Sequence, residues 1–176
     1  MSGHSKWSQI KHKKGATDKK RGVLFSKLAT AITAAAKTEP NPQFNPRLRS
    51  AIDKAKENQM PNENIERAIK RATEKGTDLD ELIFESYGPG NSAILIEAIT
   101  DNRNRTVSEI KKLLSDYHAK WAESGSVLWA FEQAPDKTWT AKFPLDISEE
   151  DKAKLAKLLE ALDEHPDIQK IYTNAQ

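Results

Sequence analysis

The sequence predicts an α+β protein of two domains, on three observations. Apolar residues recur at helical spacing through the first part of the chain, about as far as residue 75. From about Glu81 onward, short β-branched stretches alternate with amphipathic ones. A chain of 176 residues that is 37% hydrophobic has room for one or two folded domains. We therefore expect a three-helix domain in residues 1–80 and an α+β domain in residues 81–176.

Three amphipathic helices are expected in the first domain. The first covers about Arg21–Lys37. The second begins at Pro46 with Asn45 as its N-cap, because proline at the first helical position lacks only an N–H that would have no partner. The third is capped by Asn62 and stops by Gly76. Their expected buried faces are Leu24, Leu28, Ala31, Ile32 and Ala35, then Leu48, Ala51, Ile52 and Ala55, then Ile65, Ala68, Ile69 and Ala72.

The second domain is expected to follow the order βαββαβ, which is that of the ferredoxin-like fold. A Gly88–Gly90 turn introduces the first strand. The first helix is opened by the capping box Thr106–Glu109, and the second is capped by Ser148 and carries a leucine stripe. The expected strands are Ser92–Thr100, Ser126–Glu132, Thr138–Phe143 and Ile168–Thr173.

Charge is distributed unevenly along the chain, although the formal net charge is only +2. Residues 1–80 contain 17 Lys and Arg against 9 Asp and Glu, whereas residues 81–176 contain 11 against 17. Residues 1–27 alone hold eight basic residues and a single acid, Asp18. A basic half joined to an acidic half predicts that the basic half binds a polyanion, and nucleic acid is the usual one.

The basic tail and first helix form the first candidate site. Cations on a helical or flexible track suit phosphates, and an indole can stack on an unpaired base. The expected contacts are Lys6, Trp7, Lys11, His12, Lys13, Lys14, Lys19, Lys20 and Arg21. Further cations either extend this patch or pair with nearby acids at helical spacing: Arg47, Arg49, Lys54, Arg67, Lys70 and Arg71. The alternative interpretation is a lysine-rich tail that is merely solvated.

A second candidate lies between the strand Ser92–Thr100 and the following helix. Arg103 and Arg105 can clamp a phosphate, and Asn102 lies beside them near a helix N-terminus that favours anions. The alternative is that Arg105 pairs with an acid of its own domain.

Several function classes are excluded or disfavoured by the sequence. Without cysteine there is no disulfide, thiolate metal site or Cys nucleophile, and no HExxH, Walker, GxSxG or GxGxxG motif occurs. The four histidines are interpreted as surface residues, and Trp121, Trp129 and Trp139 as core or interface residues. We expect no enzyme activity, metal, cofactor or small-molecule substrate. The apolar run Ala93–Ile99 is too short to span a bilayer, so a cytoplasmic protein without a membrane partner is expected.

Several of these segments together resemble the YebC family of probable transcriptional regulators, which is related to the mitochondrial translational activator of cytochrome oxidase. The segments that carry the resemblance are GHSKWSQIKHKKGATDKKRG (3–22), NPRLRSAIDKAKENQMPNENIERAIKR (45–71), YGPG (87–90), TDNRNRT (100–106), GSVLWAFE (125–132) and LDEHPDIQKIYTNA (162–175). Family members carry a middle domain inserted between strands of the last one. Here only a short linker follows GSVLWAFE, and the inserted domain is therefore absent.

The resemblance implies control of gene expression without catalysis. It implies either a DNA-binding transcriptional regulator or a ribosome-associated factor that activates translation, so the expected partners are DNA or ribosomal RNA and the ribosome. The residues carried over are Lys6, Trp7, Lys11, His12, Lys13 and Lys14 of the opening motif, together with Asn102, Arg103 and Arg105 of TDNRNRT. A third interpretation is a protein-interaction module in which the acidic second domain binds a basic partner.

Overall fold

The computed structural model describes residues 18–176, which form two compact units. Residues 18–81 together with 99–103 make up one, here called the helical unit. Residues 82–98 together with 104–176 make up the other, here called the sheet unit. Each is described by itself below.

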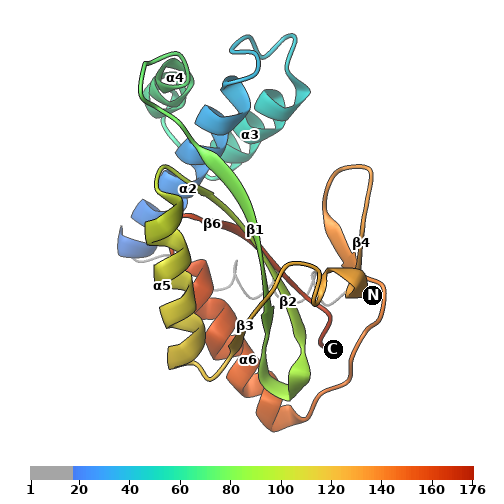
Figure 1. The fold of residues 1–176 in the computed structure, drawn as a ribbon. Coiled ribbons are helices and arrows are strands. Elements are labelled where there is room, and N and C mark those ends of the chain that lie inside the picture. Colours follow the sequence, from blue (N-terminus) through green and yellow to red (C-terminus); the bar gives the residue numbers. More distant parts are fainter. Residues whose placement is uncertain (1–17) are drawn as a thin grey trace. The chain divides into compact units, whose positions relative to one another are not determined.

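The helical unit contains the three helices that the apolar spacing predicts. They are α2 (Asp18–Ala36), α3 (Pro46–Glu57) and α4 (Asn62–Arg71), and both later helices pack against α2 (Figure 1). Their shared core is Leu28, Ile32, Ala35, Ala36, Leu48, Ile52, Ala55, Met60, Ile65 and Ala68. The expected cap of α4 is wrong: Asn62 is already helical, and Pro61 precedes it without a side-chain cap. The helix ends at Arg71, short of Gly76.

Asn45 joins the end of α2 to the start of α3, and it is the N-cap that the sequence predicts. Its Oδ1 accepts the Leu48 N–H at 3.0 Å, which satisfies one of the unpaired amides of the helix start. Its Nδ2 donates to the carbonyl oxygens of Ala35 at 2.8 Å and Glu39 at 2.7 Å. This buried side chain therefore closes the connection between the two helices.

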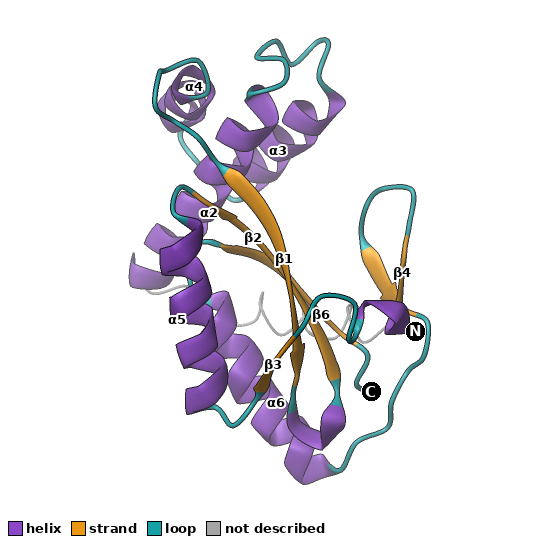
Figure 2. Ribbon diagram, in the orientation of Figure 1, coloured by secondary structure: helices purple, strands orange, loops and turns teal. Residues whose placement is uncertain are grey.

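A four-stranded sheet forms the centre of the sheet unit, in the order β3-β1-β2-β6 (Figure 2). Strand β1 pairs antiparallel with β3, and β2 pairs antiparallel with β6. A separate antiparallel pair is formed by β4 and β5. The strands are β1 (Asp80–Tyr87), β2 (Ala93–Thr100), β3 (Lys120–Ala122), β4 (Phe131–Gln133), β5 (Trp139–Ala141) and β6 (Ile168–Thr173).

Strand β2 contributes to two hydrophobic layers. Its Ile94 and Ile96 pack in one core with helices α5 (Arg103–Asp116) and α6 (Glu149–Asp163). Its Ala93 and Leu95 pack on the opposite face, in a second core with Phe131, Tyr172 and the segment before β4. Burial on both faces explains why this strand is a nearly continuous apolar run rather than an alternating one.

The turn between β1 and β2 lies where the glycines predict it. Gly90 has a φ of +66°, and a Cβ there would lie 2.7 Å from Cγ2 of Ile147. Both the backbone conformation and the close approach therefore require glycine.

The predicted α+β class is confirmed, but several elements of the sheet unit differ from their predicted form. Strands β1 and β3 were not predicted, and both belong to the central sheet. The expected strand Ser126–Glu132 begins instead with a 3₁₀ turn, Leu128–Ala130, and only then becomes β4. The expected strand Thr138–Phe143 is shorter, and it pairs with β4 outside the central sheet.

The capping box Thr106–Glu109 is also wrong, because α5 already begins at Arg103. Among the described helices, none is both long and apolar enough to cross a membrane.

Candidate nucleic-acid interface

The structure describes half of the residues predicted to contact nucleic acid. Lys6, Trp7, Lys11, His12, Lys13 and Lys14 lie outside the described residues. Lys19, Lys20 and Arg21 belong to α2, and all three are exposed. Asn102 and Arg103 are exposed as well, and they belong to the same helical unit as α2. Arg105 belongs to the sheet unit.

The first turns of α2 present cations to solvent along one short segment. Lys19, Lys20 and Arg21 follow Asp18 directly, so consecutive positions point in successive directions around the helix rather than along one stripe. Lys27, one turn and a half further on, is buried at 7% exposure and does not belong to this exposed set. The accessible cations of α2 are therefore concentrated at its beginning.

The segment between β2 and α5 divides into two parts with different partners. The Asn102 N–H donates to Oγ1 of Thr100 at 2.9 Å, which fixes the backbone just before α5 begins. Arg103 occupies the first helical position, with its side chain exposed. Arg105 donates to Oδ2 of Asp167 at 2.9 Å and lies 3.8 Å from Glu109. Arg105 thus pairs with acids of its own unit, the alternative that the sequence left open.

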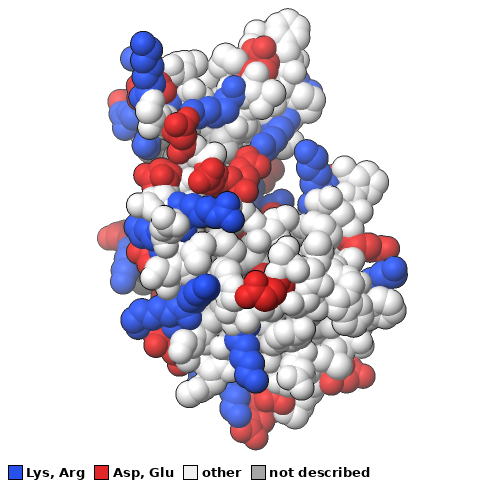
Figure 3. All heavy atoms as spheres, in the orientation of Figure 1, with Lys and Arg blue, Asp and Glu red and all other residues white. Residues whose placement is uncertain are grey.

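Some of the remaining cations of the helical unit form ion pairs with acids. Arg67 pairs with Glu63 at 3.0 Å, one turn away as the sequence suggests, and Arg47 pairs with Glu81. Arg49 donates to two backbone carbonyls of the loop before α3. The helical unit holds 14 Lys and Arg against 11 Asp and Glu among its described residues, and the sheet unit holds 10 against 15. On the face drawn in Figure 3, blue and red side chains are interspersed among uncharged ones.

One group of side chains has the composition of a metal site but is already occupied by hydrogen bonds. Glu109, His165 and Asp167 offer ligand atoms within 4.8 Å of one another. Nε2 of His165 lies 2.8 Å from Glu109, and Nδ1 accepts the Asp167 N–H at 3.2 Å. Oδ2 of Asp167 accepts from the Thr106 hydroxyl at 2.7 Å. Both ring nitrogens therefore have protein partners, so this network ties α5 to the start of β6.

This network also corrects the expectation that all four histidines lie on the surface. His165 is buried, with both of its ring nitrogens hydrogen-bonded. His118 is exposed as expected, and His4 and His12 lie outside the described residues.

Glu85 is a buried structural residue whose role the sequence does not predict. It lies in β1 at only 4% exposure. Its Oε2 accepts the N–H groups of Val127 at 2.7 Å and Leu128 at 2.9 Å, and its Oε1 accepts that of Gly125. One carboxylate thus holds the loop that leads into the 3₁₀ turn. A buried acid with three amide partners gives no signal in sequence, because the partners lie about forty residues away.

The sequence matches the models of one protein family. The model of the TACO1/YebC protein N-terminal domain matches residues 5–75, and the model of the TACO1/YebC second and third domain matches residues 79–135 and 134–175. These matches cover nearly the whole sequence, so the chain belongs to the TACO1/YebC family. The two segments of the second model meet in the turn between β4 and β5.

Individual relatives agree with this assignment. A probable transcriptional regulatory protein of Geotalea uraniireducens is 50% identical over 150 residues, covering 84% of this chain and 59% of that protein. One from Chlorobium phaeobacteroides is 54% identical over 136 residues, covering 76% and 54%. This chain therefore spans somewhat more than half the length of these relatives.

A solved structure has the same fold. The crystal structure of a conserved hypothetical protein from Aquifex aeolicus matches with a TM-score of 0.87 and 33% identity. The match covers 97% of this chain and 96% of that one.

Proposed function

We propose that this protein is a non-catalytic, nucleic-acid-binding regulator of gene expression that docks through the cations of its helical unit. One observation supports the proposal most directly. Five of the described residues that the sequence predicts to contact nucleic acid come from two distant segments, and all five are exposed in the same compact unit. They are Lys19, Lys20, Arg21, Asn102 and Arg103. The excess of cations over acids in that unit favours a polyanionic ligand, and the names of the relatives favour a role in regulation.

The mechanism is electrostatic docking on a phosphate backbone. Exposed lysine and arginine side chains displace counterions from the nucleic acid, so the affinity is governed mainly by salt and weakly by sequence. Arg103 suits a two-pronged contact with one phosphate, since its guanidinium is planar and exposed at the first position of α5. Arg105 serves the proposed contact indirectly, because its ion pairs hold the first turn of α5 to Asp167.

The salt dependence of binding tests this proposal. For duplex DNA, neutralising six phosphates gives a slope of log K against log salt of about −5, and for single strands about −4. Replacing Lys19, Lys20 and Arg21 together by alanine is expected to make the duplex slope shallower by about 3 and to weaken binding uniformly across sequences. Fluorescence anisotropy of the full chain at several KCl concentrations measures both.

A matched control removes three lysines from the other unit. Lys152, Lys154 and Lys157 are exposed on α6, so their replacement by alanine removes the same charge while leaving the proposed contacts unchanged. We expect this variant to bind as the wild type does. A slope near zero for the wild type contradicts the proposal, as does an equal loss in both triple variants.

A cosedimentation experiment distinguishes a DNA target from a ribosomal one. Cosedimentation with ribosomes at low salt, in the presence of DNase, and loss at high salt would support a ribosome-associated translation factor. Retention on DNA and absence from ribosomes would support a DNA-binding transcriptional regulator.

A further inference from the structure

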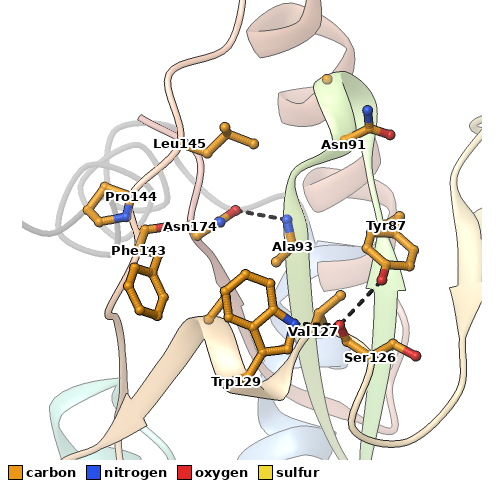
Figure 4. Close-up of a pocket in the computed structure, with 12 residues that line it drawn as sticks. Tyr87, Asn91, Ala93, Ser126, Val127, Trp129, Phe143, Pro144, Leu145 and Asn174 are labelled. Atoms are coloured by element: carbon orange, nitrogen blue, oxygen red, sulfur yellow. Dashed lines mark hydrogen bonds between the residues drawn. The ribbon is translucent and has the colours of Figure 1, made fainter.

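Exposed aromatic rings gather at one place in the sheet unit. Among the described residues, six large hydrophobic side chains are exposed, and three of these line a single pocket: Trp129 at 64% exposure, Phe143 at 50% and Tyr87 at 38%. The pocket has a volume of about 400 Å³, within the range of small-ligand sites. In Figure 4, Trp129 lies between Phe143 and Tyr87. Of the two expected places for Trp129, core or interface, the core is wrong, because the side chain is exposed.

The rings are held in place although they are open to solvent. The indole N–H of Trp129 donates to the carbonyl oxygen of Ser126 at 2.8 Å, and the hydroxyl of Tyr87 donates to the same atom at 3.3 Å. Asn174 donates to the Phe143 carbonyl at 3.0 Å and accepts the Ala93 N–H at 2.8 Å (Figure 4). Glu85 holds the loop that carries Ser126 and Trp129 through its bonds to the backbone N–H groups of that loop. These hydrogen bonds use the edges of the Trp129 and Tyr87 rings and the backbone at Phe143, so they leave the 64% exposed surface of Trp129 open to a ligand.

The polar groups at the rim favour a flat ligand that carries a phosphate. Trp129 and Phe143 have centroids 5.5 Å apart with their planes tilted by 48°, so they form two walls rather than a closed stack. Lys142 does not line the pocket itself, but its ammonium group lies over the ring of the lining residue Phe143, 5.6 Å from the ring centroid, where a phosphate attached to a base stacked on Trp129 can reach it. Asn91 adds an exposed amide at the rim, which can pair with the edge of a base.

We infer that this pocket binds an unpaired nucleobase, with its 5′-phosphate at Lys142, and that it makes the protein prefer single-stranded over fully paired nucleic acid. The inference rests on the proposed function, since it supplies a base contact to a protein that is proposed to bind nucleic acid. Acids outnumber basic residues in the sheet unit, so stacking and not general electrostatic attraction must supply the affinity here. A base already paired and stacked in a duplex cannot enter.

Aromatic substitutions test the pocket. Trp129→Ala and Phe143→Ala are each expected to weaken binding of a short oligothymidylate about tenfold and to leave binding of a blunt-ended, mixed-sequence duplex without unpaired bases unchanged. Trp129→Phe keeps a ring and is expected to retain most of the affinity. Tyr117→Ala is the control, because Tyr117 is an exposed aromatic of the same unit that does not line the pocket. Unchanged oligothymidylate binding by both pocket variants overturns the inference and leaves the proposed function standing.

A second readout does not depend on the cations of α2. In the full chain, adenosine monophosphate is expected to shift the NMR signal of the Trp129 indole N–H, both in the wild type and in the variant lacking Lys19, Lys20 and Arg21. A shift in both forms, without binding of longer nucleic acid by either, supports the pocket and contradicts the proposed function. A Trp129 signal that responds to an apolar peptide but not to the nucleotide makes this a protein-docking surface and overturns the inference.

Discussion

Glu85→Gln is expected to lower the free energy of unfolding by about 3 kcal/mol, because three backbone amides lose a buried carboxylate as their acceptor. The glutamine side chain has the same shape, but its NH₂ group would face at least one of the N–H donors of Gly125, Val127 and Leu128. Urea unfolding of the two proteins measures the difference. Amide exchange of Val127 and Leu128 should also accelerate in the variant.

The control for Glu85 lies on the loop that it holds. Glu123 is exposed, so Glu123→Gln changes the same chemical group without removing a buried acceptor. This variant is expected to stay within about 0.5 kcal/mol of the wild type. Equal losses for the two substitutions would show that charge alone, and not the three amide bonds, accounts for the effect.

Asn45→Ala is expected to cost about 3 kcal/mol, because one buried side chain caps α3 and also donates to two carbonyls. Asn45→Ser separates these roles, since a serine oxygen can still accept the Leu48 N–H but cannot reach the carbonyl oxygens of Ala35 and Glu39. A loss of about 2 kcal/mol is expected for the serine variant. Chemical denaturation monitored by circular dichroism provides both values.

Asn58 offers the comparison at the other end of the same helix. Its Nδ2 makes one exposed bond to the Lys54 carbonyl, at 2.8 Å, so Asn58→Ala is expected to have an effect of less than about 0.5 kcal/mol. If Asn45→Ala is no more costly than Asn58→Ala, then the burial of Asn45 contributes nothing and the account of the helix junction is wrong.

The helical unit was largely predictable because its determinants are local. Asn45 and Pro46 mark the start of α3 within a few residues of sequence, and the apolar stripe of each helix can be read without knowledge of the others. The error at Asn62 has a physical reason: it is the first helical residue, preceded by Pro61, whose carbonyl accepts the N–H of Asn64 and Ile65.

The sheet unit was less predictable because distant partners override local patterns. Strand β1 contains three consecutive buried residues, Phe84, Glu85 and Ser86, so neither an alternating nor an apolar pattern is visible. Strand β3 has three residues, too few to show a period. The amides of Val127 and Leu128 bond to Glu85, so they are lost to the ladder expected for Ser126–Glu132. Thr106 lies inside α5, three residues after its start, so it is not the cap, and its hydroxyl donates to Asp167 instead.

The candidate sites also divide into one that local sequence predicts and one that depends on distant contacts. The exposure of Lys19, Lys20 and Arg21 follows from their place before the first buried residue of α2. The aromatic pocket was not predictable, because Trp129 and Phe143 are brought together only by the turn and pairing of β4 and β5. A local sequence pattern does not indicate that these two rings lie in contact.

The turn between β4 and β5 lies where the two matched parts of the family model meet, which bears on where this fold can accept an inserted segment. The two matched parts of the family model meet at residues 134–135, and the turn there is closed by hydrogen bonds between Ala134 and Thr138 and between Lys137 and Ala134. Paired strands lie about 5 Å apart, so the ends left by opening this turn are adjacent in space. A folded module whose own termini lie close together can therefore be added or removed here while Phe131 and Trp139 keep their places. The β4–β5 hairpin is therefore a point at which the fold can accept an insertion, and in this chain a short turn closes it.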